Sequence, residues 1–227
     1  MKKIDRAIDH SNKRISKKNR SKLLQAVVQS YERNDIDYFD VQYVCNSIEN
    51  IHNASLIIDD LPMFDNDAER SGIPTTHVVY GEQTALLAAI SIIFKSFKGE
   101  LNSDIIDELS KMGMQMCKGQ SLEFDDEIDI HEYHALKTGS MFLAVCRIGA
   151  IMCDANPDDW NEFAHHLGLL YQLNDDLEDI NQNDIYNLAN EIKDINIDQY
   201  MKNVTRSIPH NVNEDVIILF LQQCLNK

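Results

Sequence analysis

Residues that break helices are scarce along this chain. Its 227 residues include only 8 glycines and 4 prolines, and alternating strand patterns flanked by turn dipeptides are hard to find. Apolar residues instead recur at spacings of three and four, as they do on the buried face of a helix. Val44, Ile48, Ile51 and Ile58 form one such stripe. The chain is therefore predicted to be all-α, a single-domain helical bundle.

The breaks in this pattern divide the chain into helices. They are predicted at residues 21–33, 40–60, 82–97, 104–124, 131–153, 158–180, 185–207 and 213–226. Pro62 is expected to end the second of these, because a proline ring clashes with the preceding helical turn. The sequence shows no repeat, linker or low-complexity tract. We therefore expect residues 1–227 to form one domain.

The charge balance excludes several classes of function. With 21 basic and 37 acidic residues the net charge is −16, whereas nucleic acids and anionic membrane surfaces attract a basic face. We therefore expect no nucleic-acid partner. The sequence has no run of 18 or more apolar residues, and its first residues are charged without an apolar signal core. A cytoplasmic protein without a transmembrane segment is the expectation.

Two aspartate clusters stand at the ends of apolar segments. Asp59, Asp60, Asp65 and Asp67 follow Ile57-Ile58, and Asp175, Asp176 and Asp179 follow a second apolar segment. Clustered carboxylates repel one another, and aspartate is a poor helix residue. Mg²⁺ accepts oxygen ligands and is commonly held by one or two carboxylates together with substrate phosphates. The clusters predict a magnesium site, the alternative being helix-terminal acids on a solvated face.

Basic residues give two further signals. Lys137 lies inside an apolar helix, where an unpaired lysine is rare, although it could also extend its head to the surface. Residues 13–22 carry a strong basic patch, made of Lys13, Arg14, Lys17, Lys18, Arg20 and Lys22. This patch is either a solvated arm or a site that holds an anion opposite the metal.

A second kind of metal site is also open to the sequence. Glu49 with His52, and Glu162 with His165, each form a Glu-x-x-His pair. Two such pairs on helices of a bundle are typical of di-iron carboxylate proteins. That alternative leaves both aspartate clusters unused.

Taken together, these residues resemble the trans-isoprenyl diphosphate synthases of the polyprenyl synthetase family, especially its short-chain geranylgeranyl and farnesyl diphosphate synthases. Residues 52–65 resemble the first aspartate-rich motif, and Gln172 with residues 175–179 matches the second. Gly119-Gln120 and Lys137-Thr138-Gly139 match two further motifs. Residues 16–23 resemble the Gly-Lys-x-x-Arg segment, with Ser16 in place of glycine.

The resemblance implies a bundle of the isoprenoid synthase type around a central cavity, and a role for each matched residue. Three Mg²⁺ ions would bind with the substrate diphosphate, directly through Asp59, Asp65 and Asp175, supported by Asp60, Asp176 and Asp179. Arg70, Lys137, Thr138 and Gln172 would contact the allylic substrate. Lys17, Arg20 and His52 would hold isopentenyl diphosphate. The catalytic set would be Asp59, Asp60, Asp65, Lys137, Asp175 and Asp176.

The implied reaction joins an allylic diphosphate of 5 to 15 carbons to isopentenyl diphosphate in a homodimeric transferase. In the family, an aromatic residue four or five places before the first aspartate stops the product at fifteen carbons. Here Ser55 and Ala54 stand at those places. Their small side chains imply a twenty-carbon product, geranylgeranyl diphosphate, unless Leu86 or Leu87 closes the pocket.

The chain departs from the family pattern at several positions. Ser71 replaces the second arginine of Arg-Arg-Gly, Asn174 replaces an arginine, and Glu123 replaces an aspartate. The domain is also expected to be shortened at its N-terminus and after the second motif. These losses of cationic contacts keep two alternatives open: a catalytically weak, partner-dependent subunit, and a terpene-synthase-like enzyme that ionises a diphosphate without elongating it.

Overall fold

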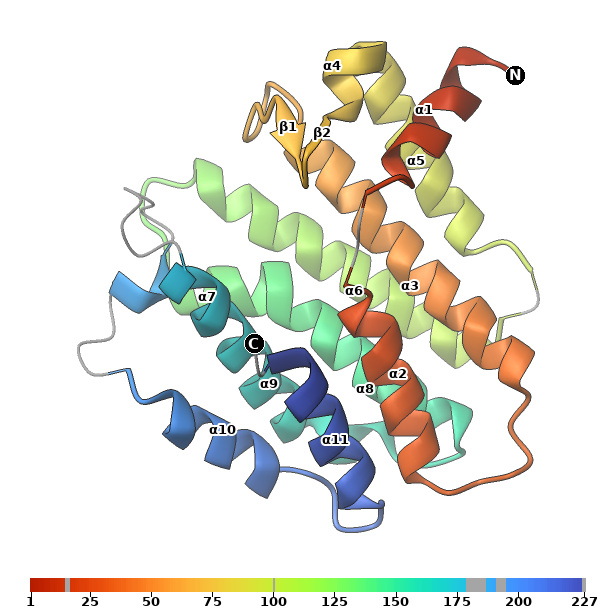
Figure 1. Ribbon diagram of the computed structural model, residues 1–227, viewed down its shortest axis with the longest axis vertical. Coiled ribbons are helices and arrows are strands. Elements are labelled where there is room, and N and C mark those ends of the chain that lie inside the picture. The colour runs from red at the N-terminus through yellow and green to blue at the C-terminus, as the bar shows by residue number, and fades with distance from the viewer. Residues whose placement is uncertain (15–16, 100, 179–186, 191–194, 226–227) are drawn as a thin grey trace. The chain divides into compact units, whose positions relative to one another are not determined.

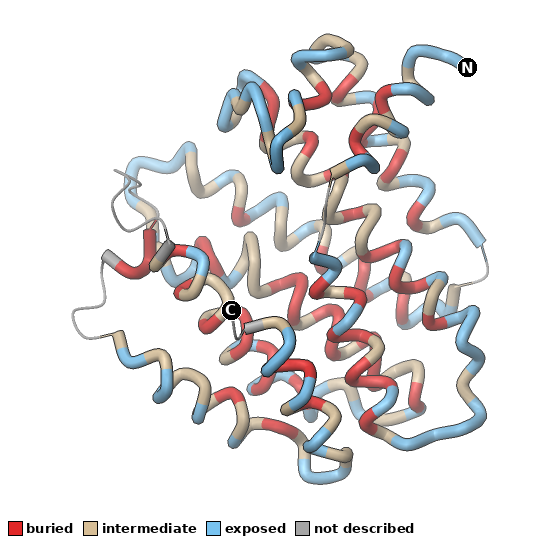
Figure 2. Tube along the Cα trace, in the orientation of Figure 1, coloured by how far each residue is buried: buried red, intermediate tan, exposed pale blue. Residues whose placement is uncertain are grey.

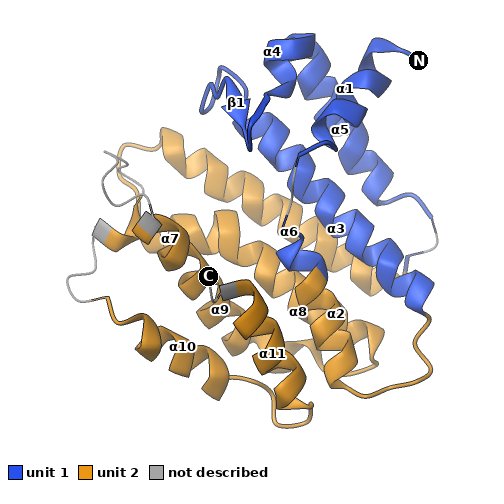
Figure 3. Cartoon of the chain, in the orientation of Figure 1, with its two compact units in different colours: residues 1–21, 38–101 blue, residues 22–37, 102–227 orange. Residues whose placement is uncertain are grey.

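The computed structural model describes residues 1–14, 17–99, 101–178, 187–190 and 195–225. These residues are mostly helical, with one short two-stranded hairpin (Figure 1). The predicted all-α fold is confirmed. The chain divides into two compact units: unit 1 holds residues 1–21 and 38–101, and unit 2 holds residues 22–37 and 102–227 (Figure 3). The expectation of one domain stays a prediction.

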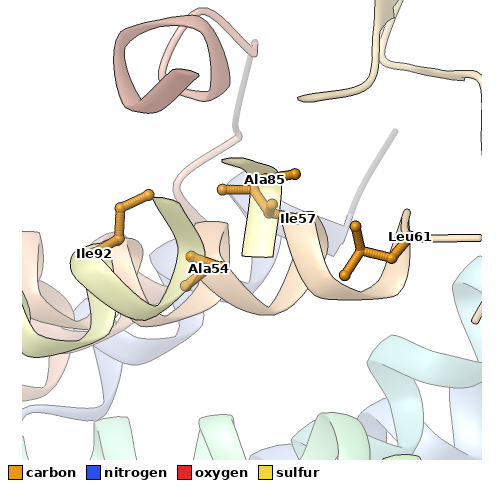
Figure 4. Close-up of a cluster of buried hydrophobic side chains, with 6 residues drawn as sticks. Ala54, Ile57, Leu61, Ala85 and Ile92 are labelled. Carbon is orange, nitrogen blue, oxygen red and sulfur yellow. The ribbon is translucent and has the colours of Figure 1, made fainter. Parts of the chain in front are cut away.

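Unit 1 is built on the packing of two helices. Its elements are α1 (Lys3–Ser11), α3 (Tyr38–Asp59), β1 (Glu69–Arg70), β2 (Ile73–Pro74), α4 (Thr76–Tyr80) and α5 (Glu82–Ser96). Helix α3 lies along α5, and α1 contacts α4 and α5. Small residues such as Ala54 and Ala85 let α3 and α5 approach closely around Ile57, Leu61 and Ile92 (Figure 4). This apolar cluster supports the end of α3.

Unit 2 holds the remaining helices. They are α2 (Asn19–Ser30, of which residues 19–21 fall in unit 1), α6 (Ser103–Ser121), η1 (Leu122–Phe124), α7 (Ile130–His134), η2 (Ala135–Gly139), α8 (Ser140–Met152), η3 (Pro157–Trp160), α9 (Asn161–Glu178), η4 (Leu188–Asn190), α10 (Ile197–Arg206) and α11 (Glu214–Leu225). Helix α8 contacts both α6 and α9 and buries most of its residues (Figure 2). A Cβ at Gly149 would come within 2.5 Å of Val27 Cγ1, which shows how closely α2 and α8 pack.

The structure refines the predicted elements in three places. Helix α1 was not predicted, although Ala7 and Ser11 on it are buried. The helix predicted at residues 131–153 is confirmed as one continuous helical stretch, Ile130–Met152, whose middle part η2 is a π-helix between α7 and α8. Of the helix predicted at residues 185–207, the described residues form two separate pieces, η4 and α10, and residues 185–186 and 191–194 lie outside the described residues.

One stretch of the described chain, Ile130–Met152, meets the length and hydropathy of a membrane-spanning helix. Half of its most apolar window is buried inside the protein. A core helix has this combination of composition and burial. The stretch is weak evidence for a span.

Candidate active site

The first acidic segment, residues 59–67, folds back on itself. Helix α3 ends at Asp59, as Pro62 predicts. The Asp65 N–H then donates to the Asp59 carbonyl at 3.0 Å, and the Asn66 N–H donates to the Leu61 carbonyl at 3.2 Å. Asn66 has a φ of 55°, a left-handed conformation that asparagine tolerates better than most residues. The turn brings Asp65 back to Asp59, from which a straight helix would separate it.

Asp60 is buried between two arginines. Its residue exposure is 0%, and its oxygens accept from Arg70 Nε and Arg14 Nη2. Arg70 also pairs with Asp67 at 2.8 Å and with Asp65 at 3.6 Å. A buried carboxylate is tolerated when it is paired and hydrogen-bonded. The structure thus joins Arg70 to the first acidic segment and adds Arg14.

Three arginines lie close enough to His52 to affect its charge. The pKa of His52 is lowered from 6.5 to about 2, mainly by burial and also by the positive charges of Arg20, Arg70 and Arg14. His52 is therefore neutral at pH 7. Lys17, which the resemblance adds to this group, is exposed. Arg20 therefore lies near His52, and the binding role of the two residues stays a prediction.

The Lys137-Thr138-Gly139 motif forms part of the π-helix η2. A Cβ at Gly119 of α6 would lie 2.6 Å from Lys137 N, and a Cβ at Gly168 of α9 would lie 3.0 Å from Gly139 Cα. Glycines on two neighbouring helices therefore allow close contact with the backbone of η2. Single π-turns inside helices are frequent at functional sites. Here the π-turn sets the directions of Lys137 and Thr138.

Lys137 is held by a carboxylate and a phenol. Its Nζ lies 2.7 Å from Glu123 Oε1 and 3.0 Å from the Tyr133 hydroxyl. That hydroxyl donates to the same Glu123 oxygen at 2.6 Å, and Gln120 Nε2 donates to the other oxygen. Glu123 thus orients a cation from η2. Glu123 stands out in the sequence as a departure from the family pattern, whereas Tyr133 carries no motif signal and was not predicted.

A second chain of hydrogen bonds joins η2 to the second acidic segment, residues 175–179. Thr138 Oγ1 donates to Gln172 Oε1 at 3.1 Å, and Gln172 Nε2 donates to Asp176 Oδ1 at 2.6 Å. The Leu188 N–H donates to Asp176 Oδ2 at 2.7 Å. Asp176 is buried and Asp175 is exposed. Asp179, a predicted metal ligand, lies outside the described residues.

The donor chemistry of both acidic segments fits magnesium. Asp59 and Asp65 share one turn, and Asp175 presents a carboxylate at the surface of α9. Within the described ranges, no three His, Cys, Asp or Glu side chains gather as a metal site by themselves. Such a cluster is not needed for Mg²⁺, which binds through one or two carboxylates and substrate phosphates.

The Glu-x-x-His pairs gain no support. Glu49 belongs to unit 1 and accepts from the Ser21 N–H and hydroxyl at 3.1 and 2.8 Å. Glu162 and His165 belong to unit 2 and are exposed. A di-iron site requires carboxylates and histidines that converge on one point, and nothing in the described residues brings these pairs together.

Unit 2 also contains a mostly apolar cavity of about 300 Å³. Leu136, Gly139 and Leu143 line it, with His134 and Leu169. Lys137, Thr138 and Gln172 are not among its lining residues. The cavity therefore adjoins η2 without belonging to the hydrogen-bonded groups described above.

Known proteins similar to this chain are prenyl diphosphate synthases. The geranylgeranyl diphosphate synthase of Rhodobacter capsulatus is 35% identical over 145 residues, 59% of this chain and 50% of the relative. A short chain isoprenyl diphosphate synthase of Methanocaldococcus jannaschii is 34% identical over 173 residues, which are 69% of this chain and 52% of the relative. The farnesyl diphosphate synthase of Bacillus subtilis is 34% identical over 187 residues, which are 72% of this chain and 62% of the relative. The chain thus spans between half and two thirds of these curated relatives.

Solved structures share the fold. A geranyltransferase from Helicobacter pylori, complexed with magnesium and isoprenyl diphosphate, has a TM-score of 0.84 at 24% identity and covers 99% of this chain and 88% of its own. A geranyltransferase from Legionella pneumophila has a TM-score of 0.80 at 20% identity, and the match covers 99% of this chain and 86% of that protein. The family model for polyprenyl synthetase matches residues 1–213. This chain belongs to the polyprenyl synthetase family.

Proposed function

We propose that this chain is a magnesium-dependent prenyltransferase that condenses an allylic diphosphate with isopentenyl diphosphate. The observation that carries the proposal is the hydrogen-bonded set Thr138, Gln172 and Asp176, with Lys137 beside it on the π-helix. It joins two motifs that lie far apart in the sequence. Relatives named as geranylgeranyl and farnesyl diphosphate synthases support the same reaction.

Asp59, Asp65 and Asp175 are the proposed direct ligands of three Mg²⁺ ions. Bound with the substrate diphosphate, the ions would supply Lewis-acid stabilisation of the charge on the leaving group. Asp60 is held by Arg14 and Arg70, so its proposed supporting role is to fix these arginines. Asp176 accepts hydrogen bonds from Gln172 and Leu188, and its proposed role is to fix the end of α9 that carries Asp175. Asp179 is the proposed last member of the second motif.

Lys137, Thr138, Gln172 and Arg70 are the proposed contacts of the allylic substrate. The Lys137 ammonium is a hydrogen-bond donor suited to a diphosphate oxygen, and Glu123 fixes its starting position. As the allylic C–O bond breaks, its electron pair leaves with the diphosphate. Donors already in place stabilise this charge without reorganisation. An allylic carbocation remains.

Lys17, Arg20 and His52 are the proposed binding groups for isopentenyl diphosphate. The arginine suits a diphosphate because its planar guanidinium donates in a fork, and neutral His52 can donate one hydrogen bond. The isopentenyl double bond then attacks the carbocation and forms the new C–C bond. The released diphosphate accepts the proton that is lost, so the reaction needs no protein base.

The proposed product is the twenty-carbon geranylgeranyl diphosphate. Ser55 is partly exposed, and its hydroxyl donates to the His52 carbonyl of its own helix at 2.9 Å. Ala54 is fully buried in the apolar cluster between α3 and α5, against which Leu86 also packs. Leu87 is 56% exposed. Of the four residues considered, we therefore propose Ser55 and Leu86 as the ones that limit product length.

Replacing the small side chain should shorten the product. Ser55→Phe is expected to shift the main product from twenty to fifteen carbons, because a phenylalanine there would occupy the volume that a longer chain needs. Mass spectrometry of the products provides the readout. Ala54→Phe is a matched control that should destabilise the protein by about 1–3 kcal/mol through overpacking. An unchanged product length with Ser55→Phe would remove Ser55 from the pocket.

The reaction itself is tested with purified protein, isopentenyl diphosphate and each allylic diphosphate of 5, 10 and 15 carbons, in Mg²⁺ or EDTA. A Mg²⁺-dependent elongated product that disappears in Asp59→Ala and Asp175→Ala is expected. No product from a folded protein that binds diphosphate would favour the partner-dependent subunit. Diphosphate release without elongation would favour the terpene-synthase-like alternative.

The proposal includes a homodimer. Leu87, Ile90 and Phe94 are exposed on α5, at spacings that place them on one side of the helix. An apolar stripe of this kind suits a protein interface. Light scattering coupled to size-exclusion chromatography measures the oligomeric state, and the mass of a monomer would contradict the proposed homodimer.

A further inference from the structure

Arg14 lies outside the segments that match the family motifs, yet the protein buries it. Its side chain is only 7% exposed. Burying a guanidinium costs free energy unless its donors are satisfied. Arg14 Nη2 pairs with Asp60. A single pair occupies only part of a guanidinium, which carries five N–H donors.

One nitrogen of the Arg14 guanidinium has no partner among the residues that the structure describes. Its Nη1 is buried and has no hydrogen-bond acceptor among the described residues of the protein. An unsatisfied buried donor costs about 1–3 kcal/mol, more when it is charged. Natural proteins rarely keep such a group without a ligand, ion or water that completes it. The missing partner of a guanidinium N–H is an acceptor, and an anion suits it best.

The surroundings of Arg14 indicate where that anion binds. Arg14 and Arg20 both act on the charge of His52, so both lie near this histidine. Arg70 shares Asp60 with Arg14 but is also engaged by Asp65 and Asp67. Arg14 has the unsatisfied donor beside the proposed isopentenyl diphosphate site.

The hairpin offers no substitute for this cation. Ser71, where the resemblance expects a second arginine, is exposed in the turn between β1 and β2. Ser71 and Gly72 have φ values of 54° and 78° there. These left-handed conformations are typical of a tight two-residue hairpin turn. A neutral side chain at that place adds no charge to the site.

We propose that Arg14 is a further diphosphate-binding residue, whose Nη1 donates to the diphosphate of isopentenyl diphosphate alongside Arg20 and His52. The inference rests on the proposed function for the identity of the ligand. Asp60 holds the Arg14 guanidinium through Nη2 and so presents Nη1 to the anion. Arg14 would thus supply a cation that Ser71 does not.

The test compares Arg14→Gln and Arg14→Lys with the wild type. Calorimetry in EDTA measures the binding of isopentenyl diphosphate and of inorganic diphosphate. Both variants should weaken binding about tenfold or more, because one hydrogen bond to a charged group is worth about 1.5–3 kcal/mol. In the assay, the KM for isopentenyl diphosphate should rise by a similar factor while that for the allylic substrate stays unchanged.

Arg14→Lys separates binding from a purely structural role. A lysine at this position can keep the ion pair with Asp60, but it lacks the second arm of the guanidinium. If Arg14 only holds Asp60, Arg14→Lys would bind isopentenyl diphosphate like the wild type, and that result would overturn the proposal. Because Arg14→Lys keeps the ion pair, it decides the matter even if Arg14→Gln does not fold.

Arg147→Gln is the matched control. Arg147 is also a largely buried arginine, paired with Glu108 at 2.9 Å and with Asp158 at 2.5 Å in unit 2. Its replacement should leave the affinity for isopentenyl diphosphate unchanged. If isopentenyl diphosphate binds the wild type but not the Arg14 variants, and the wild type forms no product, the proposed function is refuted while the anion site at Arg14 stands. Normal product formation by Arg14→Lys with an unchanged KM would refute the Arg14 proposal alone.

Discussion

Two buried aspartates, one in each unit, are stabilised in different ways. Asp60 and Asp176 are each the second residue of an Asp-Asp pair, and each is buried while the residue before it is more exposed. Asp60 accepts from the guanidinium groups of Arg14 and Arg70. Asp176 accepts from the Gln172 amide and the Leu188 N–H. The same sequence element is thus anchored by ions in unit 1 and by neutral donors in unit 2.

The difference shows how one protein can bind two kinds of ligand. Guanidinium groups fixed by Asp60 keep positive charge near His52, where an anion is favoured. The Gln172 amide and the Leu188 N–H are neutral donors, so these two hydrogen bonds leave the charge of Asp176 in place. The cationic groups around His52 are therefore suited to a diphosphate by themselves, whereas Asp59, Asp65 and Asp175 would need a metal ion to hold one.

The largest expected effect is on stability. Asp60→Asn should lower the free energy of unfolding by about 3–5 kcal/mol, because it leaves two arginines without their buried counter-charge. Asp176→Asn should cost only about 1–2 kcal/mol, since the Gln172 amide and the Leu188 N–H are neutral donors and one acceptor oxygen remains. Guanidinium-induced unfolding at pH 7 measures both. If both variants lose the same free energy of unfolding, Asp60 and Asp176 are not stabilised in different ways.

The second prediction concerns how η2 is shaped. Gly119→Ala should destabilise the protein by about 3 kcal/mol and lower activity, because the added Cβ would meet backbone atoms of Leu136 and Lys137 at 3.0 Å or less. Thermal unfolding and the product assay measure these effects. Gly113 on the same helix has nothing within 4 Å, so Gly113→Ala should leave activity unchanged and stabilise α6 by up to about 1 kcal/mol. Destabilisation by both would implicate α6 itself.

The third prediction concerns acid sensitivity in unit 1. The native pKa of His52, about 2, lies below its unfolded value of 6.5, so between these values only the unfolded chain binds the proton. The contribution of His52 to stability is complete above pH 6.5 and decreases as the pH falls. From pH 7 to pH 5 the loss should be about 2 kcal/mol.

His52→Asn should remove this part of the pH dependence of the unfolding free energy. The variant His165→Asn, which changes an exposed histidine of α9, should keep the wild-type pH dependence. If His52→Asn and the wild type lose stability in parallel on acidification, burial and the neighbouring arginines do not lower the pKa of His52 as described.

Local rules of the sequence predicted the elements that local physics fixes. Pro62 ends α3 wherever the helix lies, and the aspartates that follow it had to leave helical geometry. Gln172 and Asp176 are four residues apart, and a helix brings side chains at that spacing together.

The remaining features depend on contacts between distant residues. The π-helix η2 requires the close approach of Gly119 and Gly168 from two other helices, and no signal within residues 135–139 announces it. Arg14 looked like one member of a basic patch until Asp60 was found against it. Tyr133 had no motif to mark it, because its role comes from Glu123 across the fold.

The central claim is that the cationic groups around His52 bind a diphosphate without metal, whereas Asp59, Asp65 and Asp175 bind one through Mg²⁺. Calorimetry with one ligand at a time tests it most directly. Isopentenyl diphosphate should bind the wild type equally well in EDTA and in Mg²⁺. An allylic diphosphate should bind about tenfold or more tightly in Mg²⁺, a gain of about 1.4 kcal/mol or more. Isopentenyl diphosphate binding that requires Mg²⁺, or allylic binding that ignores it, would contradict the account.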